Sequence, residues 1–364
     1  MTQLLGTVDW RSFLARPRLP SPSLEVLDVL YRQPMLITGA GGSIGSALAL
    51  RLAALAPPSL LLLDASESRL YALQQAKATT GIAGTMTPIL GSVADRTLLD
   101  EVFTVHAPRI VFHAAGFKHV PLMEEQPLAA IANNVFGTLT LATAAAAHGA
   151  RVVLLSADKA VEPTSVMGAT RRIAERIVLA AGGTVLRLTN ILATRDSVTE
   201  TFARQIALGA ALTVSDPAAR RYFVTVDEAV NLLLIAAAET RQPALLAPDI
   251  PAPHYITDLA HFMARTLAPE RTVEVDFTGW RPGDKEAEQL WSTTETAHSA
   301  GENGLLAIDS QALPEGQLEA SLAALRTAVD ARDLTASLVH LCALVTDYTP
   351  SGAVVALSGN RVSR

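Results

Sequence analysis

The stretch that decides the fold is "MLITGAGGSIGSALALRLAALA", residues 35–56. A short apolar run typical of a buried strand is followed by a turn and then by apolar residues at helical spacing. Between the two, Gly39, Gly42 and Gly45 have the spacing G-x-x-G-x-x-G. The first glycine permits a tight turn, the second lets a pyrophosphate approach the backbone, and the third lets helix and strand pack closely. Because free N–H groups at a helix start bind anions, the stretch predicts a dinucleotide-binding unit.

The next apolar run, "SLLLLD" (59–64), ends on an acid that fits the same interpretation. Asp64 follows the last glycine by 19 residues, where a carboxylate accepts a hydrogen bond from a ribose hydroxyl. A carboxylate repels a 2′-phosphate, which slightly favours NAD, but Ser66 and Arg69 nearby can offset this, so NADP stays open. We expect further cofactor contacts from the turn, from "HAAG" (113–116) after the fourth strand and from the helix behind it, namely from Ser43, Ile44, Ala114, Ala115 and Asn134. His113 is expected to be packed rather than catalytic.

Further short apolar runs alternate with helical patterns along the first half of the chain. They lie at 87–90, 109–115, 151–156 and 184–188. Runs that are apolar throughout and separated by helices predict a parallel sheet covered on both faces, which is an α/β, Rossmann-type, doubly wound fold. The pattern becomes irregular after about residue 190. We therefore predict a lead-in with one short helix (1–34), a Rossmann domain (35–190, with 223–248 returning to it), a smaller α/β part (191–222 and 249–312) and a C-terminal helical pair with a tail (313–364).

Composition excludes several classes of protein. The chain has 364 residues, a formal net charge of -6 and no long run of Lys or Arg, so neither nucleic acid nor an anionic membrane is expected as its main partner. The single cysteine, Cys342, excludes an intrachain disulfide and a cysteine-cluster metal site, and no metal is predicted. The N-terminus lacks the apolar core of a signal peptide, and we find no run of about 20 apolar residues that would cross a bilayer. We expect a cytoplasmic protein.

Six motifs in order resemble one enzyme family. They are "LITGAGGSIGSAL", "LLDASESRLYALQ", "VFHAAGFKHVPLMEEQPLAAIANNVFGT", "SADKAVEPTSVMGATRR", "VSDPAARRYFVTVDEAV" and "GWRPGDKEAEQL". Together they resemble the extended short-chain dehydrogenases that act as UDP-N-acetylhexosamine 4,6-dehydratases in bacterial polysaccharide biosynthesis, without the membrane-spanning half of many members. The resemblance implies a nicotinamide cofactor, a UDP-sugar substrate bound by the smaller α/β part, and a homo-oligomer.

The reaction that the resemblance implies oxidises C4 of the sugar, eliminates water across C5 and C6, and returns the hydride to C6. Asp158 and Lys159 match the family's elimination pair. A lysine in a dry pocket can have its pKa depressed toward neutral and act as the base at C5, while the acid protonates the leaving hydroxyl. By itself, an Asp-Lys dipeptide is also typical of a loop ion pair.

The resemblance also assigns the substrate contacts. Lys118 and His119 lie on the loop after the fourth strand, where ligands bind at the carboxyl ends of strands. Arg221 and Arg281 match arginines that hold the substrate diphosphate, for which the forked guanidinium is suited. Asn190, after the sixth strand, is expected to line the same cleft.

The oxidation residues depart from the superfamily's Thr, Tyr and Lys, which match Ala157, Met167 and Arg171. Methionine takes no proton, alanine has no hydroxyl, and an arginine can bond the cofactor ribose but cannot act as a base. Ser156 is expected to point to the other face of its strand. Lys159, Lys118 and an ordered water are left as candidate bases for C4 oxidation.

Three hypotheses follow from this mixture of retained and altered residues. The first is a nucleotide-sugar dehydratase. The second is an epimerase or oxidoreductase that uses the C4 ketone without elimination. The third is a non-catalytic homologue that holds a cofactor.

Overall fold

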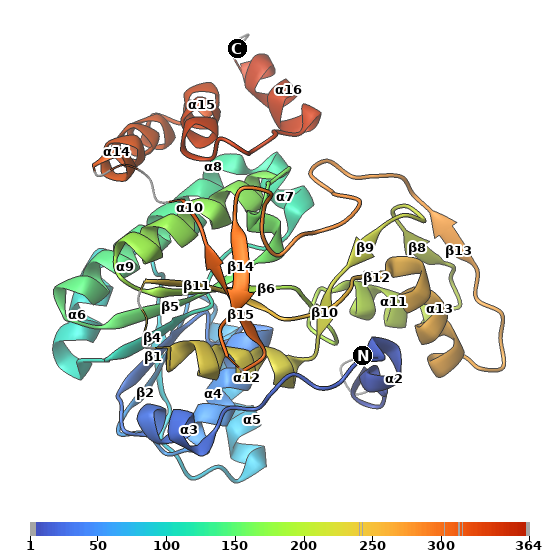
Figure 1. Cartoon of the computed structure of the whole chain (residues 1–364), viewed down its shortest axis with the longest axis horizontal. Helices are drawn as coiled ribbons and strands as arrows, with labels where there is room; N and C mark the ends of the chain where they lie inside the picture. Colours follow the sequence, from blue (N-terminus) through green and yellow to red (C-terminus); the bar gives the residue numbers. More distant parts are fainter. Residues whose placement is uncertain are drawn as a thin grey trace.

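A computed structural model describes residues 5–239, 241, 243–301, 303–311, 314 and 316–361. Its centre is a nine-stranded sheet with the order β14-β15-β11-β6-β5-β4-β1-β2-β3 (Figure 1). Seven of the strands run parallel: β1 (Met35–Thr38), β2 (Leu60–Asp64), β3 (Thr87–Leu90), β4 (Ile110–His113), β5 (Arg151–Ala157), β6 (Thr184–Leu188) and β11 (Ala244–Pro248). The predicted Rossmann-type sheet is confirmed.

Helices cover both faces of this sheet, as the uniformly apolar strands predict. One face carries α4 (Ser43–Ala53), α5 (Glu67–Thr80) and α12 (Val226–Ala237), whose leucines pack on β1 and β2. The other carries α6 (Arg96–His106), α9 (Gly137–Ala147) and α10 (Val166–Ala180). In the sheet, β6, β5, β4 and β1 are successive neighbours and run parallel, so their carboxyl ends lie side by side at one edge. Every predicted site loop of the Rossmann domain leaves from that edge.

The structure differs from two expectations about the outer parts of the chain. Residues 296–299 (β14) and 305–309 (β15) were expected in the smaller part, but they extend the main sheet as antiparallel strands, because β15 pairs with β11. The lead-in also contains a helix besides α3 (Leu24–Tyr31), namely α2 (Trp10–Leu14), which packs in the core of the smaller part. Between them, Arg16 forms a buried ion pair of 2.8 Å with Glu228 on α12. The lead-in is therefore built into both parts of the fold.

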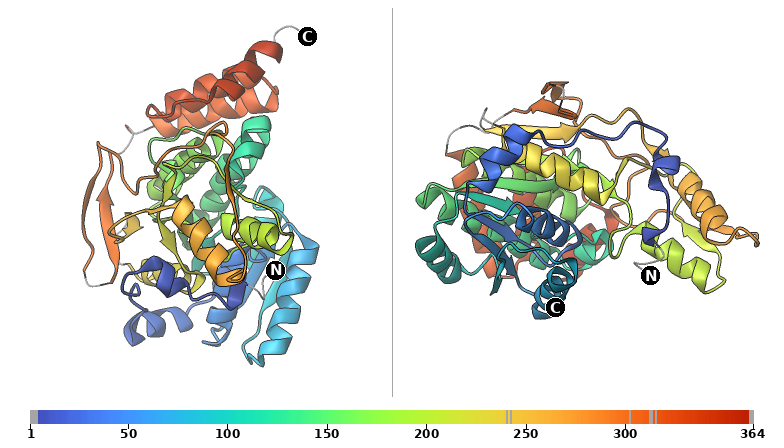
Figure 2. Two further views of the ribbon diagram at one scale, coloured as in Figure 1. Left: turned by 90° about the vertical axis from the view of Figure 1, so that its right-hand side faces the viewer. Right: turned by 90° about the horizontal axis from the view of Figure 1, so that it is seen from below.

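The smaller part lies beside the end of the sheet (Figures 1 and 2). Its core consists of α11 (Val198–Ala207) and α13 (Ile256–Leu267). Three two-stranded pairs surround them: β7 (Asn190–Ile191) with β10 (Phe223–Val224), β9 (Arg220–Arg221) with β12 (His254–Tyr255), and β8 (Leu212–Val214) with β13 (Val275–Phe277).

The C-terminal region forms three helices, α14 (Gln317–Asp330), α15 (Leu334–Leu344) and α16 (Gly352–Arg361). The first two confirm the predicted pair. They share a hydrophobic core with α7 (Val120–Glu125), α8 (Pro127–Ala130) and α10 (Figure 1). Glu124 on α7 accepts hydrogen bonds from the Val166 amide, at the start of α10, and from the Ser351 hydroxyl, just before α16. The C-terminal helices are thus connected to the first turn of α10.

One apolar helical segment is longer than the sequence analysis recognised. Residues 127–147, formed by α8, a π-helical turn (Ile131–Phe136) and α9, are long and apolar enough to cross a membrane by length and composition alone. The expectation that no such run exists is therefore wrong. However, 67% of its apolar window is buried inside the protein, because it packs against α6 and α10, as a core helix does.

Candidate active site

The glycine-rich turn between β1 and α4 has the geometry that a pyrophosphate requires. Gly39 has φ of 68°, and a Cβ there would lie 2.6 Å from the Ala115 amide nitrogen. A Cβ on Gly45 would collide with the Gly39 carbonyl. The helix begins at Ser43 with Gly42 as its N-cap, and no side chain caps it. The first amides of α4 can therefore bind an anion, so the turn fits a dinucleotide.

Asp64 closes the other side of this turn. Its carboxylate is almost fully buried and accepts hydrogen bonds from the Gly41 amide (2.8 Å) and the Ser66 amide (2.9 Å). Arg69 lies on the first turn of α5 with its Cβ against Gly41. The predicted acid is thus fixed at the end of β2, with a cationic side chain beside it.

The loop after β4 is held from behind by the π-helical turn. The Asn134 amide group accepts a hydrogen bond from the Phe117 amide (2.8 Å) and donates to the Phe117 carbonyl (3.1 Å) and to Thr170 on α10 (3.1 Å). Its side chain is buried, so Asn134 orients the loop that carries Ala114 and Ala115, and a direct cofactor contact stays a prediction. A π-helical turn often occurs at a functional site. His113 is packed, as expected, between the hydroxyls of Thr38 (2.7 Å) and Thr138 (2.9 Å).

Arg171, on α10, lies against the same loop. A Cβ on Gly116 would collide with its guanidinium, and one Nη donates to the Leu155 carbonyl at 3.3 Å. Burial lowers the pKa of Arg171 to about 10, so it stays charged at neutral pH. Met167 lies one turn earlier and is buried, while Ala157 ends β5. Neither of these two side chains can exchange a proton.

Asp158 and Lys159 form the 3₁₀ turn that follows β5 (Asp158–Ala160). The Asp158 carboxyl is 1% exposed, and its Oδ1 lies 3.1 Å from the Lys159 Nζ. Its Oδ2 is buried and has no hydrogen-bond partner among the described residues. Burial raises the pKa of Asp158, against the lowering effect of Lys159. Burial thus favours the neutral form of this carboxyl group relative to a carboxyl in water.

The predicted depression of the Lys159 pKa is not what the structure shows. Burial alone would lower this pKa, but Asp158 and a second carboxylate, Glu288 at 3.5 Å, outweigh burial and raise it. Glu288 was not identified from the sequence, although it lies in the motif "GWRPGDKEAEQL". The loop that carries it docks on the segment between the 3₁₀ turn and α10, since Thr164 donates to the Gly283 carbonyl (2.9 Å) and Lys285 donates to the Val161 carbonyl (2.6 Å).

Arg221 joins this group, whereas Arg281 does not. The Arg221 guanidinium donates to the carbonyls of Lys285 (2.8 Å) and Glu286 (3.0 Å) and lies 3.9 Å from Glu288. Arg281 is 60% exposed and pairs with Asp284 at 3.0 Å. Asn190 pairs with the backbone of Tyr222, where β7 meets β10.

Lys118 and His119 are brought to the glycine-rich turn. Lys118 donates to the Arg195 carbonyl at 2.8 Å, and the His119 Nε2 lies 3.9 Å from Asp196. Arg195 in turn binds the Gly41 carbonyl with its guanidinium and the Ser43 hydroxyl with its amide. Burial lowers the pKa of both Lys118 and His119. Their contact with a sugar stays a prediction, and Arg195 is a site residue that the sequence analysis missed.

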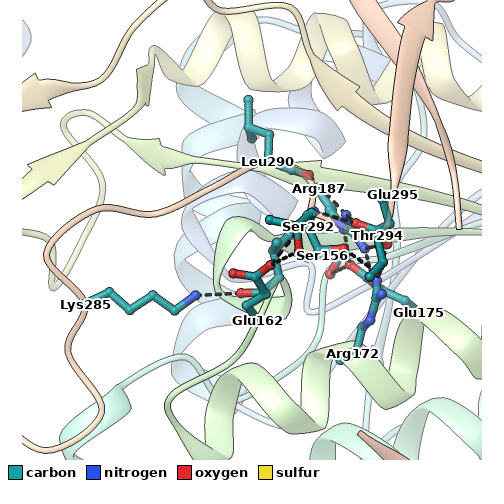
Figure 3. Close-up of polar contacts among 12 residues, drawn as sticks. Ser156, Glu162, Arg172, Glu175, Arg187, Lys285, Leu290, Ser292, Thr294 and Glu295 are labelled. Atoms are coloured by element: carbon teal, nitrogen blue, oxygen red, sulfur yellow. Dashed lines mark hydrogen bonds and ion pairs between the residues drawn. The ribbon is translucent and has the colours of Figure 1, made fainter. Parts of the chain in front are cut away.

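A cluster of buried charges connects α10, β6 and the segment before β14 (Figure 3). Arg187 on β6 is fully buried and makes two hydrogen bonds to Glu175 (2.9 and 3.0 Å) and two to Glu295 (2.8 and 2.9 Å). Arg172 pairs with the same two carboxylates. Ser156, which is expected on the face of β5 opposite Ala157, donates to Glu175 at 2.7 Å and so belongs to this cluster. The cluster fixes α10, β6 and the segment before β14 relative to one another. Within the described ranges, no group of three His, Cys, Asp or Glu side chains is placed to hold a metal ion.

Comparison with known proteins identifies the family. The family model described as polysaccharide biosynthesis protein matches residues 35–309. The chain belongs to this family. The probable polysaccharide biosynthesis protein EpsC of Bacillus subtilis is 36% identical over 80% of this chain and 52% of its own length. The chain thus spans about half the length of that relative. A UDP-glucose 4-epimerase of Rickettsia canadensis is 32% identical over 72% of this chain and 79% of its own length.

Solved structures share the fold of this member of the polysaccharide biosynthesis family. Pen from Bacillus thuringiensis superposes with a TM-score of 0.71 at 24% identity, over 77% of this chain and 88% of its own. DesIV, a dTDP-glucose 4,6-dehydratase from Streptomyces venezuelae with NAD bound, gives 0.61 at 19% identity, over 70% of this chain and 87% of its own. At these identities the likeness concerns the fold alone.

Proposed function

We propose that this protein is a nicotinamide-dependent nucleotide-sugar 4,6-dehydratase that acts on a UDP-N-acetylhexosamine in polysaccharide biosynthesis. The observation that carries the proposal is the ion pair of the buried Asp158 with the half-buried Lys159. It follows β5, at the sheet edge from which the glycine-rich turn also leaves. One oxygen of the Asp158 carboxyl is buried and has no hydrogen-bond partner in the part of the chain that the structure describes, and such an oxygen is costly unless a ligand or a proton meets it.

The residues present fit a nicotinamide dinucleotide. The amides of Ser43, Ile44 and Gly45 would hold its pyrophosphate, Asp64 its ribose, and Arg171 the nicotinamide side of the molecule. NAD is slightly favoured over NADP because of the Asp64 carboxylate, and Arg69 keeps the second possibility open. When bound, this cofactor supplies hydride acceptance from C4 and hydride return to C6.

The side chains of the protein then transfer protons and position the substrate. Asp158 and Lys159 carry out the elimination, in which the C5 proton is removed and the C6 hydroxyl leaves as water. Arg221 and Arg281 would bind the diphosphate, with Lys118, His119 and Asn190 along the cleft. Arg281 is exposed and paired only with Asp284, so it can turn toward a phosphate. An oligomer is expected, as the resemblance implies.

A direct test is to incubate the pure protein with UDP-N-acetylglucosamine and either NAD or NADP and to search for loss of one water by mass spectrometry. Asp158→Asn should abolish the loss, because an amide cannot exchange the proton. The matched control is Lys77→Gln on α5, outside every contact described for the site. An unchanged mass across several UDP-sugars would contradict the proposal.

A second candidate is an epimerase or oxidoreductase that stops at the C4 ketone. It is favoured by Ala157 and Met167, which leave the C4 oxygen without a side-chain base at the usual positions. In heavy water, a dehydratase loses water, whereas an epimerase that inverts through C5 incorporates deuterium there with its oxygen retained. A protein that does neither, forms no NADH and leaves the configuration at C4 unchanged is the non-catalytic homologue. Turnover gained by Met167→Tyr with Arg171→Lys would support that third candidate.

A further inference from the structure

The chain contains only four lysines, Lys77, Lys118, Lys159 and Lys285, and one buried carboxylate lies between two of them. Glu288 is 4% exposed. Its oxygens lie 3.5 Å from the Lys159 Nζ and 3.4 Å from the Lys285 Nζ. The Arg221 Nε lies 3.9 Å away. A carboxylate with three cations around it stays ionised, and these cations lower the pKa of Glu288 although burial opposes them.

Glu288 therefore acts on the elimination pair through Lys159. The Lys159 Nζ lies between two carboxylates, Asp158 at 3.1 Å and Glu288 at 3.5 Å. Two anions at this range hold an amine in its ammonium form. Asp158, in contrast, shares that single cation with Glu288, is buried, and keeps one oxygen without a partner. Of the two members of the pair, Asp158 is the one that is free to exchange a proton.

We infer that Glu288 is a positioning residue of the proposed dehydration, which fixes Lys159 as a permanent cation and leaves Asp158 as the group that moves the proton. This inference rests on the proposed function and reverses the role of base that the family resemblance gave to Lys159. Glu288 itself touches no reacting atom; it acts by holding Lys159.

The resulting proton path is balanced. The Asp158 carboxylate takes the proton from C5 of the 4-keto sugar, and the electron pair of that C–H bond moves toward the C4 carbonyl, where the Lys159 ammonium stabilises the enolate. The pair then forms the C5–C6 double bond as the C6–O bond breaks. Asp158 returns its proton to the departing oxygen, which leaves as water. One carboxyl group thus serves as acceptor and donor, for which a pKa raised toward neutral is suited.

The first test measures the charge of Lys159 and needs no turnover. With only four lysines, ¹³C-labelled lysine gives four side-chain signals, which single substitutions assign. In the wild type, the Lys159 signal should stay that of an ammonium up to pH 10. In Glu288→Gln its pKa should fall by about one unit or more, because one of the two neighbouring negative charges is gone. Glu286→Gln is the matched control, since Glu286 lies two residues away and its side chain pairs with Arg220 at the surface.

The second test is the pH profile of dehydration. Glu288→Gln should move the acidic limb, which reports Asp158, to lower pH by about one unit, whereas a merely structural defect would lower the rate without moving the limb. If Glu288→Gln does not fold, Glu288→Asp keeps the charge at a longer distance and should give a smaller shift in the same direction. A Lys159 that titrates below pH 8 in the wild type, or whose pKa is the same without Glu288, overturns the inference. A wild type that makes no dehydrated product contradicts the proposed function instead, while the lysine titration still decides the charge of Lys159.

Discussion

Replacing Arg187 with methionine tests the buried cluster behind the active site. Arg187 makes four hydrogen bonds to two carboxylates and a fifth to the Leu290 carbonyl (3.1 Å) (Figure 3). Methionine fills much of the same volume but leaves Glu175 and Glu295 to share only Arg172. Breaking a buried pair in this way typically costs about 3–5 kcal/mol of the free energy of unfolding.

The cluster also limits how far the free energy of unfolding can fall. An unpaired carboxylate can escape its charge by binding a proton, and at pH 7 this costs about 3.7 kcal/mol for a group with an ordinary pKa of about 4.3. We therefore expect Arg187→Met to lower the free energy of unfolding by about 4 kcal/mol at pH 7. Chemical denaturation followed by tryptophan fluorescence measures this difference, since the chain contains three tryptophans.

The loss should depend on pH with a defined sign. In the wild type, the arginines outweigh burial and depress the pKa of Glu175 and Glu295, so their contribution is present above the unfolded pKa and changes little between pH 5 and 7. In the variant, one carboxyl has a raised folded pKa, so its proton stabilises the fold as the pH falls. The destabilisation should shrink by up to about 2.7 kcal/mol from pH 7 to pH 5.

A matched double variant separates charge from packing. Arg187→Met with Glu295→Gln leaves Glu175 paired with Arg172 at 3.1 Å and removes the surplus negative charge. It should recover part of the lost stability and show little pH dependence. A loss below about 1 kcal/mol for the single variant, or a loss that is equal at pH 5 and pH 7, would refute the reasoning.

Three further predictions concern single residues. Gly45→Ala should abolish binding of NAD in a calorimetric titration while the protein stays folded by circular dichroism, because the new methyl group collides with the Gly39 carbonyl; retained affinity would contradict this. Asn134→Ala should weaken NAD binding by at least about tenfold, or about 1.4 kcal/mol, as the loop after β4 loses its two hydrogen bonds to this side chain and the link to α10 is lost as well, and an unchanged dissociation constant would show that the loop is held by other means. Glu228→Gln should lower the free energy of unfolding by about 2–4 kcal/mol in urea and expose the lead-in to trypsin at Arg16, and resistance equal to the wild type would argue against it.

The main sheet could be predicted because each of its parallel strands is recognisable from a short stretch of sequence. Runs such as 59–64 and 151–156 are apolar throughout, and the glycine spacing at 39, 42 and 45 reports the turn that follows β1. The strands β14 and β15 could not be assigned to that sheet. β15 pairs with β11, and the central partners Leu246 and Ala307 are far apart in the sequence. β14 joins the sheet only through β15, and "TAHS" (296–299) is largely exposed and polar. Pairing over such a distance leaves no local pattern.

The site was predicted where a motif fixes both position and chemistry. Asp158, Lys159 and Asp64 lie next to the turns that the sequence indicates. The direction of the Lys159 pKa shift could not be predicted, because it depends on Glu288, more than a hundred residues away. One signal was available for the buried cluster. Arg187 is the charged residue within the apolar strand "TVLRL", and a buried arginine requires buried carboxylates as partners.

The contact of Glu124 with both α10 and α16 has a consequence for protein engineering. One carboxylate joins the first turn of α10, the helix that bears Met167 and Arg171, to the segment around Ser351. The last helix therefore helps to hold α10 in place beside the candidate site. Chimaeras with longer members of the family should therefore exchange α7, α10 and α16 as one unit. A graft that replaces only the Rossmann domain would pair α10 with a C-terminal helix from another protein. We expect such a chimaera to bind nucleotide but to align its reactive groups poorly.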